Sequence, residues 1–118
     1  MLQIRREQMD VFNRLSVEQF CRRTRRHLKQ TFPSQTEEMG DERLDELIKS
    51  GIARAKRYGL EQERNVQVFL EFLVLYGLDL GTTPKTRWAR SILADRNLDE
   101  VQKVRRLQDH ATFLIREP

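Results

Sequence analysis

Apolar residues recur every three or four positions along most of the chain, and this spacing predicts α-helices. The stretch from Ser16 to Phe32 shows the pattern well, because one group of its positions falls within about 60° of a single line on a helix. The members of that group are Val17, Phe20, Cys21, Thr24, Leu28 and Phe32. Ser16 and Gln19 match a capping box, and Pro33 cannot continue a helix. We therefore expect a helix that starts at the N-cap Ser16 and ends at Phe32.

Shorter patterns predict a helix on either side of this one. A first helix is expected from about Arg5 to Leu15, with Met9 and Phe12 facing inward. After a polar turn, a third helix is expected to be capped by Asp41 and closed by Gly59. Its core positions are Leu44, Leu47, Ile48, Gly51, Ile52 and Ala55. A glycine at position 51 costs about 1 kcal/mol relative to alanine within a helix, which predicts a close helix crossing there.

The segment from Val66 to Tyr76 is apolar nearly all round, which is typical of a helix buried on several sides. A buried strand has a similar composition and is the competing interpretation. We favour a helix because polar residues from Glu61 extend the segment and Gly77 closes it. The sequence therefore predicts a central helix.

The C-terminal third predicts a loop and two more helices. The loop spans residues 77–83, and Thr83 followed by Pro84 matches an N-cap and a first-turn proline. The short helix after it contains Trp88, Ile92 and Leu93. Asn97 and Glu100 match a second capping box. The final helix has Val101, Val104, Leu107, Ala111 and Leu114 at inward positions.

These elements together predict one all-α domain, residues 1–118, in which about six helices form a bundle around a central apolar helix. A chain of 118 residues is long enough to bury a core without disulfides, and Cys21 is its single cysteine. No segment approaches the ~20 apolar residues of a membrane span. We expect a protein that is soluble, does not bind membranes and is cytoplasmic.

The formal net charge of +4 is concentrated near the N-terminus. Residues 1–34 contain eight Arg or Lys against three acidic residues, whereas the other 84 residues contain 14 against 15. Five of the cations lie within eight positions of the Ser16–Phe32 helix: Arg22, Arg23, Arg25, Arg26 and Lys29. Like charges three or four positions apart repel on a helix, so an acidic group is expected to offset them.

Two sources of that acidic group remain open. Six acidic residues within positions 37–46 would neutralise the cations if the third helix folds against the second. Otherwise the cations are free to bind carboxylates or phosphates of a partner molecule. A homodimer between the basic helix of one copy and the acidic block of another is a further alternative.

Trp88 is a second candidate contact residue, because it follows the predicted loop. A buried core tryptophan is the default interpretation, and an exposed binding anchor is the alternative. Nucleic acid is the less favoured acidic partner, because most aromatic residues occupy core positions and no groove-binding motif is evident.

Groups for catalysis are few. The chain has two histidines and one cysteine, and Cys21 and His27 lie about 240° apart on one helix, so they cannot form a nucleophile–base pair. Neither histidine has the spacing of a zinc ligand set. We therefore predict no catalytic residue, no bound metal and no cofactor.

Four groups of residues resemble a family of small helical bacterial proteins that are encoded beside type VI secretion and polymorphic toxin genes. They are Ile4-Arg5-Arg6-Glu7-Gln8-Met9, His27-Leu28 with Phe32-Pro33, Gly51-Ile52-Ala53-Arg54-Ala55 continuing to Tyr58-Gly59-Leu60 with Glu63 and Val66, and Trp88-Ala89-Arg90-Ser91-Ile92-Leu93. The chain departs from that pattern at Leu78-Asp79-Leu80-Gly81, where the family has Phe-Asp followed by an acidic or polar pair.

The resemblance implies an interaction protein rather than an enzyme. We expect a non-enzymatic accessory, adaptor or chaperone-like protein that binds a partner with an acidic surface, for which a secreted effector or toxin is the implied candidate. An immunity protein that neutralises a toxin is one alternative, and a nucleic-acid-binding protein is another. Because an inhibitor of a nuclease is usually acidic, the basic charge argues mildly against that version of the immunity role.

Overall fold

A computed structural model describes the backbone of residues 2–116 and the side chains of residues 17–111. The described chain forms six α-helices and no strand, which confirms the all-α prediction. The helices are α1 (Leu2–Thr31), α2 (Pro33–Met39), α3 (Asp41–Arg57), α4 (Glu63–Tyr76), α5 (Arg87–Leu93) and α6 (Glu100–Arg116).

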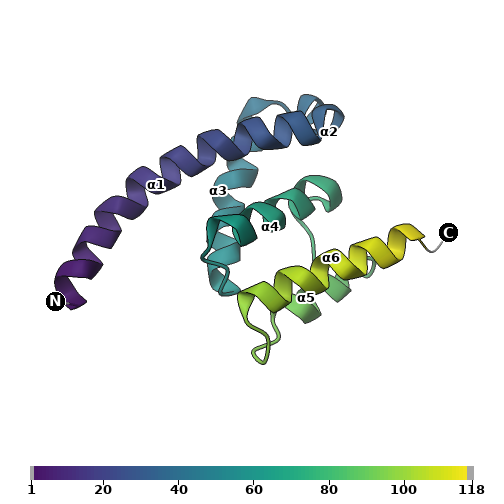
Figure 1. The fold of residues 1–118 in the computed structure, drawn as a ribbon. Coiled ribbons are helices and arrows are strands. Elements are labelled where there is room, and N and C mark those ends of the chain that lie inside the picture. The colour runs from purple at the N-terminus through teal and green to yellow at the C-terminus, as the bar shows by residue number, and fades with distance from the viewer. Residues whose placement is uncertain (1, 117–118) are drawn as a thin grey trace.

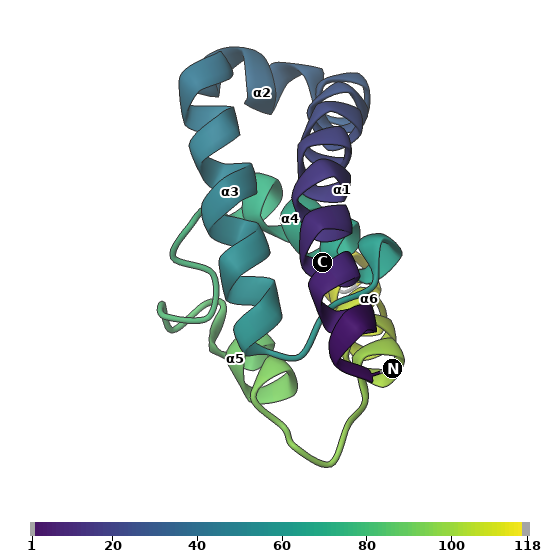
Figure 2. The same cartoon turned by 90° about the vertical axis from the view of Figure 1, so that its left-hand side faces the viewer.

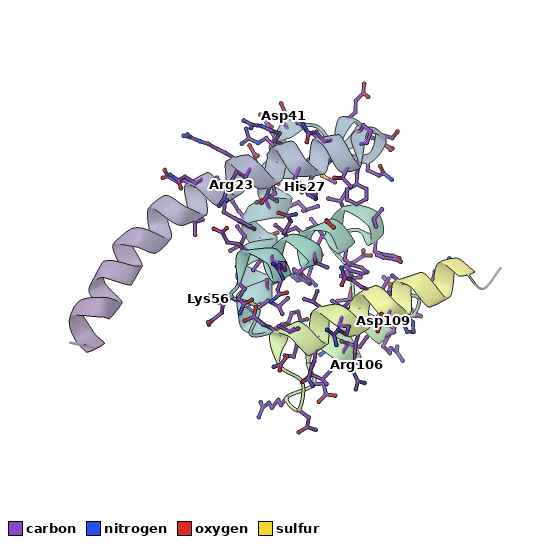
Figure 3. The ribbon with its side chains drawn as sticks, in the orientation of Figure 1. Arg23, His27, Asp41, Lys56, Arg106 and Asp109 are labelled. Atoms are coloured by element: carbon purple, nitrogen blue, oxygen red, sulfur yellow. The ribbon has the colours of Figure 1, made fainter. Side chains whose placement is uncertain are left out.

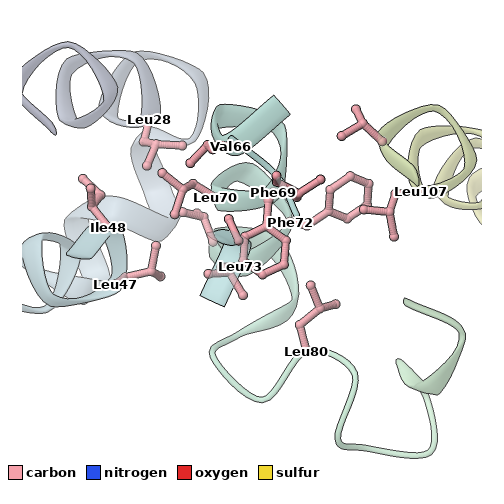
Figure 4. Close-up of a cluster of buried hydrophobic side chains, with 14 of the residues drawn as sticks. Leu28, Leu47, Ile48, Val66, Phe69, Leu70, Phe72, Leu73, Leu80 and Leu107 are labelled. Atoms are coloured by element: carbon pink, nitrogen blue, oxygen red, sulfur yellow. The ribbon is translucent and has the colours of Figure 1, made fainter. Parts of the chain in front are cut away.

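Helix α4 lies at the centre of the fold, between α1 and α6, as Figure 1 shows. Helix α2 turns the chain so that α3 runs back beside α1, which is visible in Figure 2. Buried side chains from α1, α3 and α6 converge on α4 (Figure 4), where Phe69, Leu70 and Leu73 are completely buried. The prediction of a central helix rather than a strand is therefore confirmed.

Gly51 lies where α3 crosses α4. A methyl group at this position would lie 2.9 Å from Cδ1 of Leu73 and still closer to Cδ2 of Leu70. The absence of a side chain at Gly51 therefore allows the close approach that the sequence predicted. The other predicted core positions of α3 are buried, apart from the half-buried Ile52.

The two ends of α3 differ in how well the sequence predicted them. Gly59, with φ of 81°, closes the helix as predicted, and the amide of Leu60 donates to the carbonyl of Ala55 at 2.8 Å. At the other end the N-cap is Gly40 and Asp41 is the first helical residue, so the prediction that Asp41 caps the helix is wrong. Asp41 instead contacts Lys29, as described below.

The predicted break at Ser16 is also wrong, because α1 is one continuous helix of 30 residues. The chain has no glycine or proline between Leu2 and Thr31, so nothing prevents the helix from continuing through the capping-box sequence. The predicted inward orientation of Met9 and Phe12 falls outside the described side chains.

Three further helix starts differ from the predictions. Residues 33–39 form α2 instead of a polar turn, with Pro33 in its first turn and Thr36 buried. Helix α5 starts after Thr86 rather than at Thr83, and the Thr86 hydroxyl accepts a hydrogen bond from the amide of Gly81 at 2.9 Å. The final capping box is formed by Asp99 and Gln102, whose side chains each accept the other's amide at 2.8 and 2.9 Å. Asn97 does not cap α6.

The inward face of α6 is rotated from the predicted one. Val101 is 48% exposed, whereas Lys103 is only 8% exposed and its ammonium donates to the carbonyl of Tyr58 at 2.7 Å. Val104 and Leu107 are buried as predicted, and Ala111 is half-buried. Leu114 lies outside the described side chains.

The first half of α1 projects away from the other helices (Figure 1). A compact domain of this length has an expected radius of gyration of about 13.5 Å, whereas the observed value is 15.2 Å. Phe20 is the first buried residue among the described side chains of α1, and Val17, one turn earlier on the same face, is 42% exposed. We call residues 2–16 the projecting segment.

Candidate protein-binding surface on helix α1

The second half of α1 orients the five predicted binding cations. Its Phe20, Thr24 and Leu28 are buried against the core, so this face is fixed towards α3 and α4. The cations lie on the sides and on the outer face. Figure 3 shows Arg23 and His27 on α1, with Asp41 nearby at the start of α3.

Two of the cations pair with the acidic block of α3. A nitrogen of Arg25 lies 2.7 Å from Oδ1 of Asp45, and Nζ of Lys29 lies 2.6 Å from Oδ1 of Asp41. The hydrogen bond from Lys29 and its positive charge lower the pKa of Asp41 from its ordinary value.

Arg23 is neutralised from a different element. Its Nη2 donates to both carboxylate oxygens of Glu63, at 3.0 Å each, at the start of α4. Three of the five predicted binding cations thus have carboxylate partners in their own chain. The alternative in which the third helix neutralises the basic helix is therefore confirmed for Arg25 and Lys29.

Arg22 and Arg26 remain exposed, and neither has a carboxylate within 4 Å among the described side chains. They are four residues apart, so they are neighbours on the outer face of α1. Their mutual repulsion has no compensating partner in the described part of the chain. This pair is the part of the predicted site that the structure leaves available to another molecule.

Trp88 is far from this pair in the fold and belongs to an aromatic cluster. Its ring stacks on His110 of α6, with 4.3 Å between ring centroids, and lies edge-on to Phe72 and Tyr76 of α4. The indole nitrogen donates to the carbonyl of Lys85 at 3.0 Å. The side chain is half-buried and packs against the core, so its contacts join α4, α5 and α6. A binding role for Trp88 stays a prediction.

Two leucines near the C-terminal end of α4 are exposed. Leu75 is 50% exposed, although the segment from Val66 to Tyr76 was expected to be buried on several sides, and Leu78, in the predicted loop, is 53% exposed. The backbone of the following loop is held by Arg54, whose guanidinium donates to the carbonyls of Leu78 and Leu80. No feature of the hydrophobic pattern distinguishes Leu75 from the buried residues before it.

Among the side chains of α1 that are described, residues 17–31, Cys21 and His27 do not form a nucleophile–base pair. Burial raises the pKa of the Cys21 thiol, which disfavours the thiolate needed for nucleophilic attack. His27 Nε2 donates to Glu71 at 3.2 Å, and no contact joins it to Cys21 among the described residues. Within residues 17–111 there is no cluster of three or more His, Cys, Asp or Glu side chains arranged to hold a metal ion.

A hollow in the described surface lies where α1, α2 and α3 meet. It has a volume of about 420 Å³ and is lined by Lys29, Pro33, Thr36, Glu37, Gly40 and Asp41. Its single cation, Lys29, is already paired with Asp41, so the hollow offers no free positive charge to a ligand.

Across the described residues, no helix combines the length and apolar character required to cross a membrane.

Comparisons of the chain with protein families, with curated proteins and with solved structures gave no match.

Proposed function

We propose that the protein is a non-enzymatic accessory protein that binds an acidic surface of another protein through the outer face of α1. The observation that supports this proposal is that only some cations of the basic helix have a carboxylate partner within the chain. Arg23, Arg25 and Lys29 are paired within the chain, whereas the neighbours Arg22 and Arg26 are exposed and unpaired among the described side chains. The proposed contact is therefore narrower than the sequence predicted.

The chemistry of this pair suits carboxylates. A guanidinium group presents parallel N–H donors that match a carboxylate, and such charged hydrogen bonds are about twice as strong as neutral ones. An acidic partner would also remove the repulsion between the two arginines, which costs about 0.2–0.5 kcal/mol on an exposed helix. Burial of Phe20, Thr24 and Leu28 fixes the rotation of α1 on the core and thereby keeps the two arginines on the outer face.

A protein partner is favoured over nucleic acid by the position of the aromatic residues. Trp88 and Tyr76 pack against one another and are half-buried, so neither is presented as an open platform for bases. Two free arginines would neutralise few phosphates, which would give only weak binding to a duplex. If the same face binds nucleic acid instead, a nucleic-acid-binding function replaces the proposed one.

Within this proposal, the family resemblance suggests an adaptor or chaperone for a secreted effector. The immunity role is the alternative, and the two predict different consequences of binding. A chaperone or adaptor keeps its partner soluble or delivers it, whereas an immunity protein abolishes the activity of the partner. An activity assay of the recovered partner, with and without this protein, would separate the two.

Charge reversal of the free pair tests the proposal directly. Arg22→Glu with Arg26→Glu, made in the tagged full-length protein, should reduce recovery of its partner at least about tenfold, because attraction becomes repulsion. Arg105→Glu with Arg106→Glu is the matched control, since it reverses two exposed cations on α6 that have no ion-pair partner within the described residues. The control should bind normally, and both variants should keep the circular dichroism spectrum.

Equal binding by the two double variants would remove the proposal. If duplex DNA binds instead, with log affinity falling by about 0.9 per log unit of salt for each phosphate contacted, the nucleic-acid alternative replaces it.

A further inference from the structure

Because α1 is continuous, the angular relation between its two halves is fixed. At about 100° per residue, the buried Phe20, Thr24 and Leu28 lie within about 40° of one line. Another set of helix positions lies within about 40° of the opposite line. Between positions 4 and 26 this set consists of Ile4, Gln8, Val11, Leu15, Gln19, Arg22 and Arg26, and we call these seven positions the outer line.

The outer line changes in character along the helix. In the projecting segment it contains three apolar residues, Ile4, Val11 and Leu15, and after Gln19 it continues with the two free arginines. Positions 4, 8, 11 and 15 are separated by four, three and four residues, which is the spacing by which two helices pair side by side. If α1 were broken at Ser16, these two parts would have no fixed alignment.

The projecting segment has no helix beside it in the described chain, as the separation of its ribbon in Figure 1 shows. Most helical stability in proteins comes from packing of an apolar face, and a helical stretch of this length is marginal in water without such packing. In the register of the continuous helix, positions 4, 11 and 15 fall opposite the line of Phe20, Thr24 and Leu28. A second molecule is therefore the natural source of that packing.

We propose that the partner presents an acidic amphipathic helix that lies along the outer line of α1. This inference rests on the proposed function and specifies the partner's form. Apolar side chains of the partner helix pack on Ile4, Val11 and Leu15, and carboxylates one to two turns further on pair with Arg22 and Arg26. From position 4 to position 26 the contact is about 33 Å long, which corresponds to a partner helix of about 22 residues.

Charge argues against a second copy of this chain as the occupant. The outer line contains two arginines and no acidic residue, so the same line of another copy offers no carboxylate to them. Residues 1–34 carry a net charge of +5, and pairing two such segments would bring like charges together. An acidic helix supplies both the apolar stripe and the opposite charge.

The test uses the full-length protein and fluorescent synthetic peptides of about 21 residues, which is three heptads. One peptide has leucine at positions a and d of each heptad, which face the other helix, and glutamate at the flanking positions. A second has the same composition in scrambled order, and a third replaces glutamate with lysine. The protein should bind the first peptide at least about tenfold more tightly than the other two, measured by fluorescence anisotropy.

Variants separate the apolar part of the contact from the charged part. Val11→Gln with Leu15→Gln changes no charge and should weaken binding of the first peptide at least about tenfold. Met9→Gln is the matched control, because position 9 lies on a different side of the same segment, and it should bind normally. Circular dichroism and urea unfolding of each variant check that the fold is retained.

Failure of this inference is distinguishable from failure of the proposed function. Equal binding of the ordered and scrambled acidic peptides, or normal binding by the Val11→Gln and Leu15→Gln variant, would overturn the partner helix while leaving the effect of Arg22→Glu with Arg26→Glu on partner recovery intact. Absence of peptide binding up to about 1 mM would overturn it as well. Concentration-dependent dimers in sedimentation experiments, lost in the Val11→Gln and Leu15→Gln variant, would assign the outer line to a second copy instead.

Discussion

Thr24 is an unusual residue within the described core. Its side chain is completely buried on the inward face of α1, and its hydroxyl oxygen has no hydrogen-bond partner. An unpaired hydroxyl in an apolar environment costs about 1–3 kcal/mol in proteins. Thr36 is nearly as deeply buried, but its hydroxyl donates to the carbonyl of Phe32 at 2.8 Å.

We therefore predict that Thr24→Val stabilises the protein. Valine has nearly the same shape and removes only the unpaired polar group, so the free energy of unfolding should rise by about 1 kcal/mol in urea denaturation. Thr36→Val is the control, because it removes a hydrogen bond that is made, and it should give no stabilisation. A loss of stability in Thr24→Val would show that the hydroxyl has a partner.

Single residues also show where the hydrophobic pattern misleads. Val101 was predicted to be inward and is exposed, whereas the charged Lys103 is buried and its ammonium reaches the carbonyl of Tyr58. The long apolar stem of a lysine can cover a core while its charge finds a polar group. Residue type alone does not reveal such an acceptor, because Tyr58 is 45 residues away in the chain.

At the scale of elements, a carboxylate at the start of α6 accepts hydrogen bonds from donors at the start of α4. Glu100 matched a capping box for its own helix, but its carboxylate accepts from the amide of Gln62 at 3.0 Å and from the side chain of Asn65 at 2.7 Å. Gln62 is the N-cap of α4, where backbone N–H groups lack partners within the helix, and Asn65 lies in the first turn. The contact ties the start of α6 to the start of α4.

We predict that Glu100→Ala lowers the free energy of unfolding by about 1–3 kcal/mol. The loss arises because the buried side-chain amide of Asn65 and the backbone amide of Gln62, just before α4, lose a charged acceptor. Glu46→Ala on α3 makes the same change at an exposed residue and should alter stability by less than about 0.5 kcal/mol. Urea titrations of both variants measure the difference, and equal stabilities would contradict the capping role.

The continuity of α1 shows the limit of local signals for element boundaries. Ser16 and Gln19 have the residue types of a helix start, but such residues are only a preference. No glycine or proline stops the helix in this region, and Phe20 to Leu28 pack on the core whether or not the helix begins earlier. By contrast, Gly59 and Gly77 both have positive φ, which few other residues adopt readily, and both predicted helix ends are correct.

At the scale of the whole molecule, the projecting segment is spatially separate from the body. The body is built around α4, whereas residues 2–16 extend the molecule, and its longest dimension is 54 Å. The proposed contact with a partner uses the segment and the free arginines beside it. Stability and binding should therefore be separable.

Deletion of residues 2–15 should change the free energy of unfolding by less than about 1 kcal/mol. The shortened helix would begin at Ser16 and Gln19, which can then form the capping box that the sequence suggested. Phe20→Ala is the contrasting variant and should cost about 3 kcal/mol, because it removes a buried ring. Urea denaturation compares the two, and a large loss in the deletion variant would show that the segment packs on the body.

The sequence by itself determined the helical class, the central position of α4, the close crossing at Gly51 and most of the buried positions, because each follows from local periodicity or from a property of one residue type. The tertiary structure decided which cations are free. Arg22, Arg23, Arg25, Arg26 and Lys29 are equivalent in the sequence, and only the placement of Glu63, Asp45 and Asp41 across from three of them distinguishes the set. An ion pair depends on distance in space, and residues 12 to 40 positions apart in the chain approach each other only when the helices pack.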